Sequence, residues 1–117
     1  MKTLIILNDP PYGTERTYNG LRLALALLQN PEGHELTVFL MGDAVASAKA
    51  GQMTPQGYYN VERMLKGVVT KKGHVLVCGS CMDARGLRDE EILEGCGRSS
   101  MPELAEATVA ADKVLVF

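Results

Sequence analysis

The chain has 117 residues, and its 12 basic and 14 acidic side chains give a formal net charge of -2 with neutral histidines. This balance lacks the basic excess expected of a protein that binds nucleic acid or an anionic membrane. With 46% hydrophobic and 22% charged residues, the composition is typical of a soluble globular domain and excludes a disordered or fibrous chain. A chain of this length buries enough surface for one core, so we expect a single domain over residues 1–117.

The apolar segments are too short to anchor the chain in a bilayer. The longest uninterrupted apolar run covers residues 23–28, far short of the roughly 18 residues of a spanning helix. The first apolar stretch ends at Asn8, short of the about 7 to 15 residues that a signal peptide needs. We therefore expect a cytoplasmic protein without a membrane or nucleic-acid partner.

Strand and helix signals alternate along the first part of the chain. Thr3–Leu7 and Glu35–Met41 are apolar runs typical of strands buried on both faces of a parallel sheet. Between them, Tyr18–Gln29 predicts a helix with apolar residues on more than one face. Such a helix lies beneath the sheet or in a subunit interface. Because a domain this small has little interior, we expect a homo-oligomer.

The middle of the chain carries two further helix signals. Asp43 is placed to cap a short helix over Ala44–Ala50, with a glycine next to end it. A surface loop is expected over Gln52–Gly57. Asn60 is placed to cap a helix with apolar residues at helical spacing, and Gly73 is placed to end that helix.

The last third contains two more predicted strands, His74–Cys78 and Lys113–Phe117. The segment Ser100–Ala111 predicts a helix, because it opens with a Ser-x-x-Glu capping box and an early proline. The stretch between is less regular. A short helix is expected over Asp89–Glu94 and a turn over Gly95–Gly97.

Alternating strands and helices predict an α/β fold, a three-layer α/β/α sandwich with a mostly parallel sheet. In such sheets, ligand sites collect at the carboxyl ends of the strands. Three segments reach that edge, namely residues 8–14, 42–43 and 78–86. The candidate binding residues in the first two are Asn8, Tyr12, Gly13 and Asp43. The first segment could cradle phosphate, but its two prolines remove N–H donors, and an ordinary connection is the alternative.

The segment after the third predicted strand is the most informative part of the sequence. Cys78 ends that strand, and Gly79 and Ser80 follow, so backbone N–H groups at the next turn favour the thiolate. The thiolate is the nucleophilic form of cysteine. Arg85 either adds a positive charge to this site or pairs with Asp83 on the surface.

Cys78 and Cys81 form a C-x-x-C pair, which is consistent with redox chemistry, with half of a zinc site or with small buried side chains. A zinc site would also need Cys96 and a histidine, but no second C-x-x-C follows, and His74 is about 13 Å from Cys78 along the strand. A thioredoxin-like site is disfavoured because the chain has no Trp and the pair comes late. No Walker loop or G-x-G-x-x-G is present. We therefore expect neither a metal nor a cofactor.

Six segments of the sequence carry a wider pattern: residues 7–13, 21–24, 38–45, 57–60, 78–86 and 112–117. The most specific is Cys78-x-x-Cys81-x-Asp83-x-Arg85-Gly86. Together these segments resemble the DsrE/DsrF-like family, and most closely its YchN-like branch. The resemblance covers essentially the whole chain.

The resemblance implies an α/β sandwich of about five strands that assembles into trimers or hexamers. In sulfur-relay members, a cysteine carries sulfur as a persulfide from a donor protein to an acceptor protein. That cysteine lies eight residues before the glycine of an Arg-Gly pair, which corresponds here to Cys78 ahead of Arg85-Gly86.

We therefore hypothesise a sulfur carrier, or sulfurtransferase, in which the Cys78 thiolate holds the sulfur. The N–H groups of Gly79–Cys81 and the Arg85 side chain would assist, and Cys81 could act as the resolving thiol. Two alternatives stay open. One is a dithiol redox protein that uses both cysteines, and the other is a non-catalytic oligomer that binds a small anion.

Overall fold

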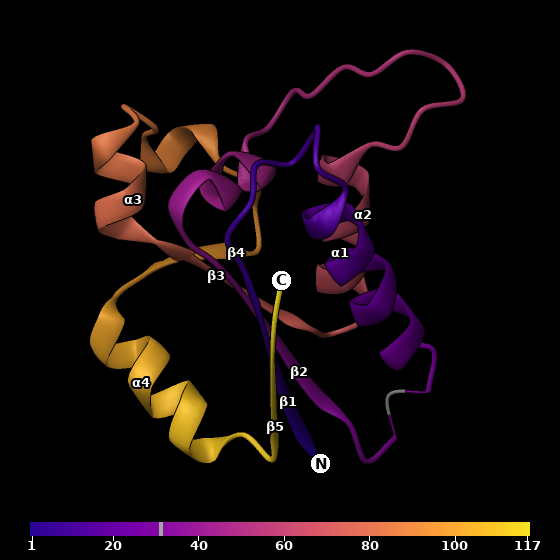
Figure 1. The fold of residues 1–117 in the computed structure, drawn as a ribbon, viewed down its shortest axis with the longest axis vertical. Coiled ribbons are helices and arrows are strands. Elements are labelled where there is room, and N and C mark those ends of the chain that lie inside the picture. The colour runs from indigo at the N-terminus through magenta and orange to yellow at the C-terminus, as the bar shows by residue number, and fades with distance from the viewer. Residues whose placement is uncertain (31) are drawn as a thin grey trace.

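The computed structural model describes residues 1–30 and 32–117. In this part of the chain, five strands form one parallel sheet in the order β4-β3-β2-β1-β5 (Figure 1). The strands are β1 (Lys2–Leu7), β2 (Glu35–Leu40), β3 (His74–Cys78), β4 (Cys96–Ser99) and β5 (Lys113–Val116). The predicted α/β class and the parallel sheet are confirmed.

Helices cover both faces of the sheet. They are α1 (Arg16–Leu27), α2 (Val61–Thr70), α3 (Gly79–Ala84) and α4 (Met101–Ala110), with short 3-10 helices η1 (Gly42–Ala48) and η2 (Asp89–Glu91). Figure 1 shows α1 and α2 on one side of the sheet and α4 on the other. The connection from β4 to β5 runs back across the sheet, so a right-handed crossover places α4 opposite α1. Among the described helices, none has the length and apolar character needed to cross a membrane.

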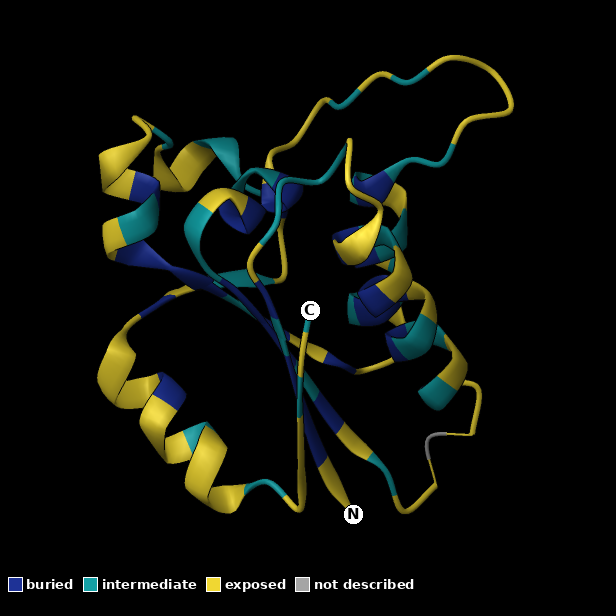
Figure 2. Ribbon diagram, in the orientation of Figure 1, coloured by how far each residue is buried: buried dark blue, intermediate teal, exposed yellow. Residues whose placement is uncertain are grey.

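The core lies between the central strands and α1 and α2. Strands β1, β2 and β3 contribute side chains that are fully buried or nearly so, among them Ile5, Phe39 and Val77. Figure 2 shows this burial concentrated in the central strands, whereas α4 is mostly exposed. Only Leu104 of α4 is classed as buried. The two faces of the sheet are therefore covered unequally.

The second apolar face of α1 packs against α2. Leu21 and Ala24 are buried, while Leu25 is half-buried. A Cβ atom at Gly67 of α2 would lie 3.1 Å from Leu25 Cδ2, so the glycine permits a close approach of the two helices. Helix packing therefore accounts for part of the apolar surface that the sequence assigned to the sheet or to a subunit interface.

The predicted turn over Gly95–Gly97 is wrong, because β4 begins at Cys96. This short strand pairs with β3, with Cys96 opposite Val75 and Ser99 opposite Cys78. Its glycine and arginine give no apolar alternation, and a strand at the sheet edge needs little of it. The expected helix over Asp89–Glu94 is also shorter, since η2 ends at Glu91.

Two helix boundaries differ from expectation, and two caps are confirmed. Asp43 is not a cap, because η1 begins at Gly42, two residues before the expected Ala44, with Met41 as its N-cap. Asn60 caps α2 by accepting a hydrogen bond from a backbone N–H at 3.0 Å. The left-handed residue after α2 is Lys72, with φ 70°, and Gly73 donates its N–H back to the helix at 2.8 Å. Ser100 caps α4.

Candidate functional site

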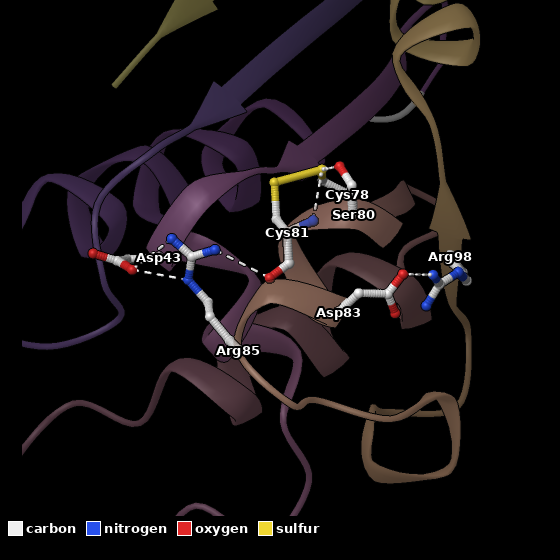
Figure 3. Close-up of a disulfide and its surroundings, with 7 residues drawn as sticks. All are labelled: Asp43, Cys78, Ser80, Cys81, Asp83, Arg85 and Arg98. Atoms are coloured by element: carbon white, nitrogen blue, oxygen red, sulfur yellow. Dashed lines mark hydrogen bonds and ion pairs between the residues drawn. A yellow bond between two sulfur atoms is a disulfide. The ribbon is translucent and has the colours of Figure 1, made fainter.

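The candidate residues lie along the edge of the sheet where the strands end. Cys78 ends β3, Asn8 directly follows β1, and Asp43 lies in η1 just after β2. Figure 3 shows that the structure brings one group of side chains together around Cys78 and Cys81. The loop after β1 belongs to the same edge, but its polar groups have other partners.

The segment after Cys78 is a helix rather than a loop. Helix α3 begins at Gly79, and Cys78 is its N-cap residue. The Cys78 Sγ accepts a hydrogen bond from the backbone N–H of Cys81 at 3.3 Å, as a serine oxygen does at many helix starts. The Ser80 Oγ lies 3.4 Å from the same sulfur. The sulfur of Cys78 therefore accepts one backbone N–H, that of Cys81, and lies beside one hydroxyl.

The first turn of α3 places Cys81 beside Cys78. The two residues are joined by a disulfide, with their Cα atoms 5.3 Å apart (Figure 3). Met82 is fully buried and holds the helix against the core. Cys78 is only 5% exposed, whereas Cys81 is half-buried. The geometry thus permits both a dithiol and a disulfide in one rigid turn.

Arg85 follows α3 and points back toward Asp43 and Cys81 (Figure 3). Its Nε and Nη2 lie 2.9 and 2.8 Å from Oδ1 of Asp43, and its Nη1 donates to the carbonyl oxygen of Cys81 at 3.0 Å. The alternative pairing with Asp83 is wrong, because Asp83 accepts from Arg98. Arg85 therefore links η1 to the backbone of the cysteine turn.

Arg98 of β4 is part of the site and was missed by the sequence prediction. Its guanidinium donates to Asp83 at 2.6 Å and to Asp89 at 3.1 Å, and these bonds raise the pKa of Arg98. The side chain crosses Gly79, where a Cβ atom would lie 2.8 Å from Arg98 Nε. A second arginine thus covers the start of α3. Arg98 was missed because the sequence predicted a turn over Gly95–Gly97 and no strand there.

The loop after β1 holds parts of the fold together. The backbone N–H and the Nδ2 of Asn8 both donate to the carbonyl oxygen of Phe117, at 3.0 and 3.2 Å. The Tyr12 hydroxyl donates to Oε1 of Gln52 and accepts from the backbone N–H of Val61 at 3.1 Å. These bonds join three distant segments of the chain.

A cluster of all four tyrosines packs next to this loop. Tyr59 stacks on Tyr18, Tyr58 and Tyr12, with ring centroids 4.0, 4.5 and 5.5 Å apart. Burial, followed by the nearby Tyr58, raises the pKa of Tyr59 to about 12. Gly13, beside Tyr12, has φ 120°, a backbone conformation that favours glycine. The sequence pointed only to Tyr12 and Gly13, because the stacking depends on tertiary structure.

Cys96 lies apart from the cysteine pair. It starts β4 opposite Val75, three residues before the end of β3, which is about 10 Å along the strand. Burial raises the pKa of the Cys96 thiol to about 11. Within residues 1–30 and 32–117, no group of three or more His, Cys, Asp or Glu side chains is placed to hold a metal ion.

Comparison with known proteins identifies a family and several relatives of this chain. A family model described as the DsrE/DsrF-like family matches residues 1–117. The chain is 39% identical over 116 residues to Protein YchN of Escherichia coli (strain K12), covering 99% of this chain and 98% of that protein. It is 30% identical over 130 aligned positions to Sulfurtransferase TusD of Salmonella typhi, with both chains fully covered.

Solved structures show the same fold. The crystal structure of the ychN protein from E. coli superimposes with a TM-score of 0.94 at 39% identity, covering 99% of this chain and 98% of that one. Protein MTH1491 of unknown function from Methanobacterium thermoautotrophicum has a TM-score of 0.78 at 12% identity, covering 99% and 97% of the two chains. At that identity the second likeness concerns the fold alone.

Proposed function

Because the chain belongs to the DsrE/DsrF-like family, we propose that it works in sulfur relay as a small cytoplasmic sulfur carrier with Cys78 as the carrier residue. One relative that matches over its whole length is named a sulfurtransferase, which supports the sulfur-relay role. The assignment to Cys78 rests on the hydrogen bond that its sulfur accepts from the N–H of Cys81. Such a contact stabilises a thiolate and, by the same logic, a persulfide anion.

The reaction is a pair of thiol exchanges at one sulfur. In the reduced protein, the Cys78 thiolate attacks the outer sulfur of a donor persulfide, R–S–SH. The bond between the two donor sulfurs breaks, the donor leaves as R–S⁻, and Cys78 holds the group S–SH. An acceptor thiolate then attacks this outer sulfur, and Cys78 leaves as the thiolate. No electrons are gained or lost overall.

The neighbouring residues have distinct roles in this proposal. Arg85 holds the backbone of the turn through the carbonyl of Cys81, and Asp43 fixes Arg85 in turn. Arg85 is therefore a positioning residue rather than a direct partner of the sulfur. Cys81 is the resolving thiol: its thiolate and the Cys78 persulfide react to give the Cys78–Cys81 disulfide and HS⁻.

A second candidate function is dithiol redox chemistry, and the disulfide between Cys78 and Cys81 favours it. The two functions differ in what the pair exchanges. A carrier gains and loses a sulfur atom, whereas a redox protein gains and loses two hydrogens.

Intact mass spectrometry after incubation of the reduced protein with a persulfide donor separates these functions. We expect a gain of one sulfur atom in the wild-type protein and no gain in Cys78→Ser. The matched control Cys81→Ser keeps the gain and holds it longer, because the resolving thiol is gone. A loss of two hydrogens in the wild-type protein, together with no sulfur gain in Cys81→Ser, supports redox chemistry instead. Loading of Cys78→Ser but not of Cys81→Ser reverses the two roles, and no change in any protein favours a binding function.

We further propose that the protein is a homo-oligomer, such as a trimer or hexamer, which buries the exposed apolar side chains of α4 and β5. Val109 of α4 is 88% exposed and Val116 of β5 is 61% exposed. In the part of the chain that the structure describes, β5 has a neighbouring strand on one side only. Sedimentation at micromolar concentration is expected to show an oligomer. A stable monomer would contradict this assembly.

A further inference from the structure

The two sulfurs of the disulfide lie in different surroundings. Cys78 belongs to the core and is 5% exposed, while Cys81 is half-buried on the first turn of α3. The Sγ of Cys78 accepts the N–H of Cys81 at 3.3 Å and lies 3.4 Å from the Ser80 hydroxyl. Cys78 is therefore the covered residue with the hydrogen-bonded sulfur, and Cys81 is the residue more accessible from solvent.

This difference in surroundings predicts which sulfur of the disulfide an incoming nucleophile attacks. Thiol–disulfide exchange is faster at the accessible sulfur, and it is faster when the leaving sulfur is stabilised as a thiolate. Accessibility and stabilisation of the leaving thiolate both favour attack at Cys81. The nucleophile attacks Cys81, and Cys78 leaves as a thiolate held by the Cys81 N–H and the Ser80 hydroxyl.

The charges around the pair also permit an anionic nucleophile. Two carboxylates beside the cysteine turn are paired with arginines, Asp43 with Arg85 and Asp83 with Arg98. Each arginine side chain is more than one-third exposed. An approaching anion therefore meets neutralised pairs rather than uncompensated negative charge.

We propose that the disulfide form takes up sulfur directly from hydrosulfide, with Cys81 as the entry point. This proposal rests on the proposed carrier function and names a second sulfur source for it. The lone pair of HS⁻ attacks Cys81 Sγ, the disulfide bond breaks, and its electron pair stays on Cys78 as a thiolate. Cys81 then carries S–SH. The sulfide sulfur is oxidised, the disulfide is reduced by two electrons, and no other oxidant is required.

A second exchange connects this entry point to the carrier residue. The Cys78 thiolate attacks the outer sulfur of the Cys81 persulfide, and Cys81 leaves as a thiolate. The product has S–SH on Cys78 and a thiolate on Cys81, which is the carrier form. The net uptake is the reverse of the resolving step, and an excess of hydrosulfide drives it. The 5.3 Å separation of the two Cα atoms allows the sulfurs to meet without movement of the helix.

The experiment treats the oxidised wild-type protein with polysulfide-free sodium sulfide while iodoacetamide is already present. The treatment is repeated at rising iodoacetamide concentrations, so that capping of the first-formed thiolate and persulfide competes increasingly well with the second exchange. We expect a gain of one H₂S before capping, a stable label on Cys78, and a label on Cys81 that a reductant removes together with the outer sulfur. Fragmentation of the peptide that spans both cysteines locates the two labels. Ser80→Ala is expected to react several-fold more slowly, because the leaving thiolate loses one contact.

Two controls keep this inference separate from the carrier function. The reduced wild-type protein and Cys81→Ser have no Cys78–Cys81 disulfide, so neither is expected to gain sulfur from sulfide, although both load from a persulfide donor. A reductant-labile label that stays on Cys78 in the same proportion as the iodoacetamide concentration rises overturns the entry point at Cys81. Failure of the disulfide form to gain sulfur overturns the use of hydrosulfide. Neither result affects loading of the reduced protein, which alone decides the carrier function.

Discussion

The ends of β3 and β1 lie at the same edge of the sheet, but their polar groups are used in different ways. After β3, the sulfur of Cys78 interacts with Ser80 and Cys81, which are two and three residues away. After β1, the Tyr12 hydroxyl reaches partners that lie 40 and 49 residues further along the chain. The contacts after β3 are therefore local in sequence, whereas those after β1 connect distant parts of the chain.

Under the proposed function, this difference assigns reactivity to the end of β3 and stability to the loop after β1. A hydroxyl that both donates and accepts within the protein is occupied, and its loss leaves partners without a hydrogen bond. A sulfur at the start of a helix keeps an exchangeable bond while the backbone N–H groups stay in place. Sequence motifs at the two ends look equally polar, so their roles separate only when the partners are known.

Among the substitutions that test this difference, Tyr12→Phe is expected to lower the stability most. The substitution keeps the ring in the tyrosine cluster but leaves the Val61 N–H and the Gln52 side chain without the hydroxyl. We expect the free energy of unfolding to fall by about 1–3 kcal/mol. Sulfur loading per folded molecule should be unchanged. Denaturant unfolding and intact mass measure the two quantities, and a folded variant that no longer loads sulfur would place the loop in the active site.

Arg85→Gln tests the cysteine turn without touching a sulfur. The variant loses the ion pair with Asp43 and weakens the bond to the Cys81 carbonyl, so the turn is held less firmly. We expect the rate of persulfide loading to fall by up to about tenfold, which corresponds to about 1.4 kcal/mol of activation free energy. Stability should change by less than about 1 kcal/mol, because the pair is partly exposed.

Asp43→Asn is the matched control for this variant. It removes the charge of the pair but leaves the Arg85 bond to Cys81, so its loading rate should lie between those of wild type and Arg85→Gln. Complete loss of loading in Arg85→Gln would instead indicate that the guanidinium contacts the reacting sulfur.

Asn8→Ala is expected to have a smaller effect. Its side chain donates to the carbonyl oxygen of Phe117, but that oxygen also accepts the backbone N–H of Asn8, which the substitution leaves in place. The loss should therefore be about 0.5–1 kcal/mol of unfolding free energy, with normal sulfur loading. Chemical denaturation measures the first quantity. A loading defect at unchanged stability would restore Asn8 as a binding residue.

The sequence was sufficient for the parts of the fold that apolar patterning dictates. The strands that end at Leu7 and Cys78 were predicted because strands buried on both faces need continuous apolar runs. β4 was missed because Cys96–Ser99 lies at a sheet edge, where pairing with β3 replaces the need for such a run. Because β4 was not predicted, the position of Arg98 was not predicted either. Only the order of elements, which requires a strand before α4, could have indicated this strand.

The candidate site was predictable to the same degree. Cys78 and Cys81 were singled out by a C-x-x-C motif at the end of a predicted strand, and the family resemblance pointed to Cys78. The partner of Arg85 was not predicted, since Asp83 is closer in sequence than Asp43 but points to Arg98. Charge pairs between distant segments are set by the packing of elements, and a spacing rule does not contain that information.

Cys96→Ser should have the smallest effect on sulfur chemistry. This thiol is about 10 Å along the strand from the end of β3, and burial raises its pKa to about 11. A raised pKa means that the thiolate is scarce at neutral pH and becomes abundant only as the pH rises toward that value. In the reduced protein, Cys96 should therefore be alkylated by iodoacetamide more slowly than Cys78, and its rate should rise about tenfold per pH unit between about pH 7 and pH 10. Loading of Cys96→Ser should equal that of wild type. Rapid labelling of Cys96 at neutral pH, or loss of loading in the variant, would mean that this thiol takes part in the relay.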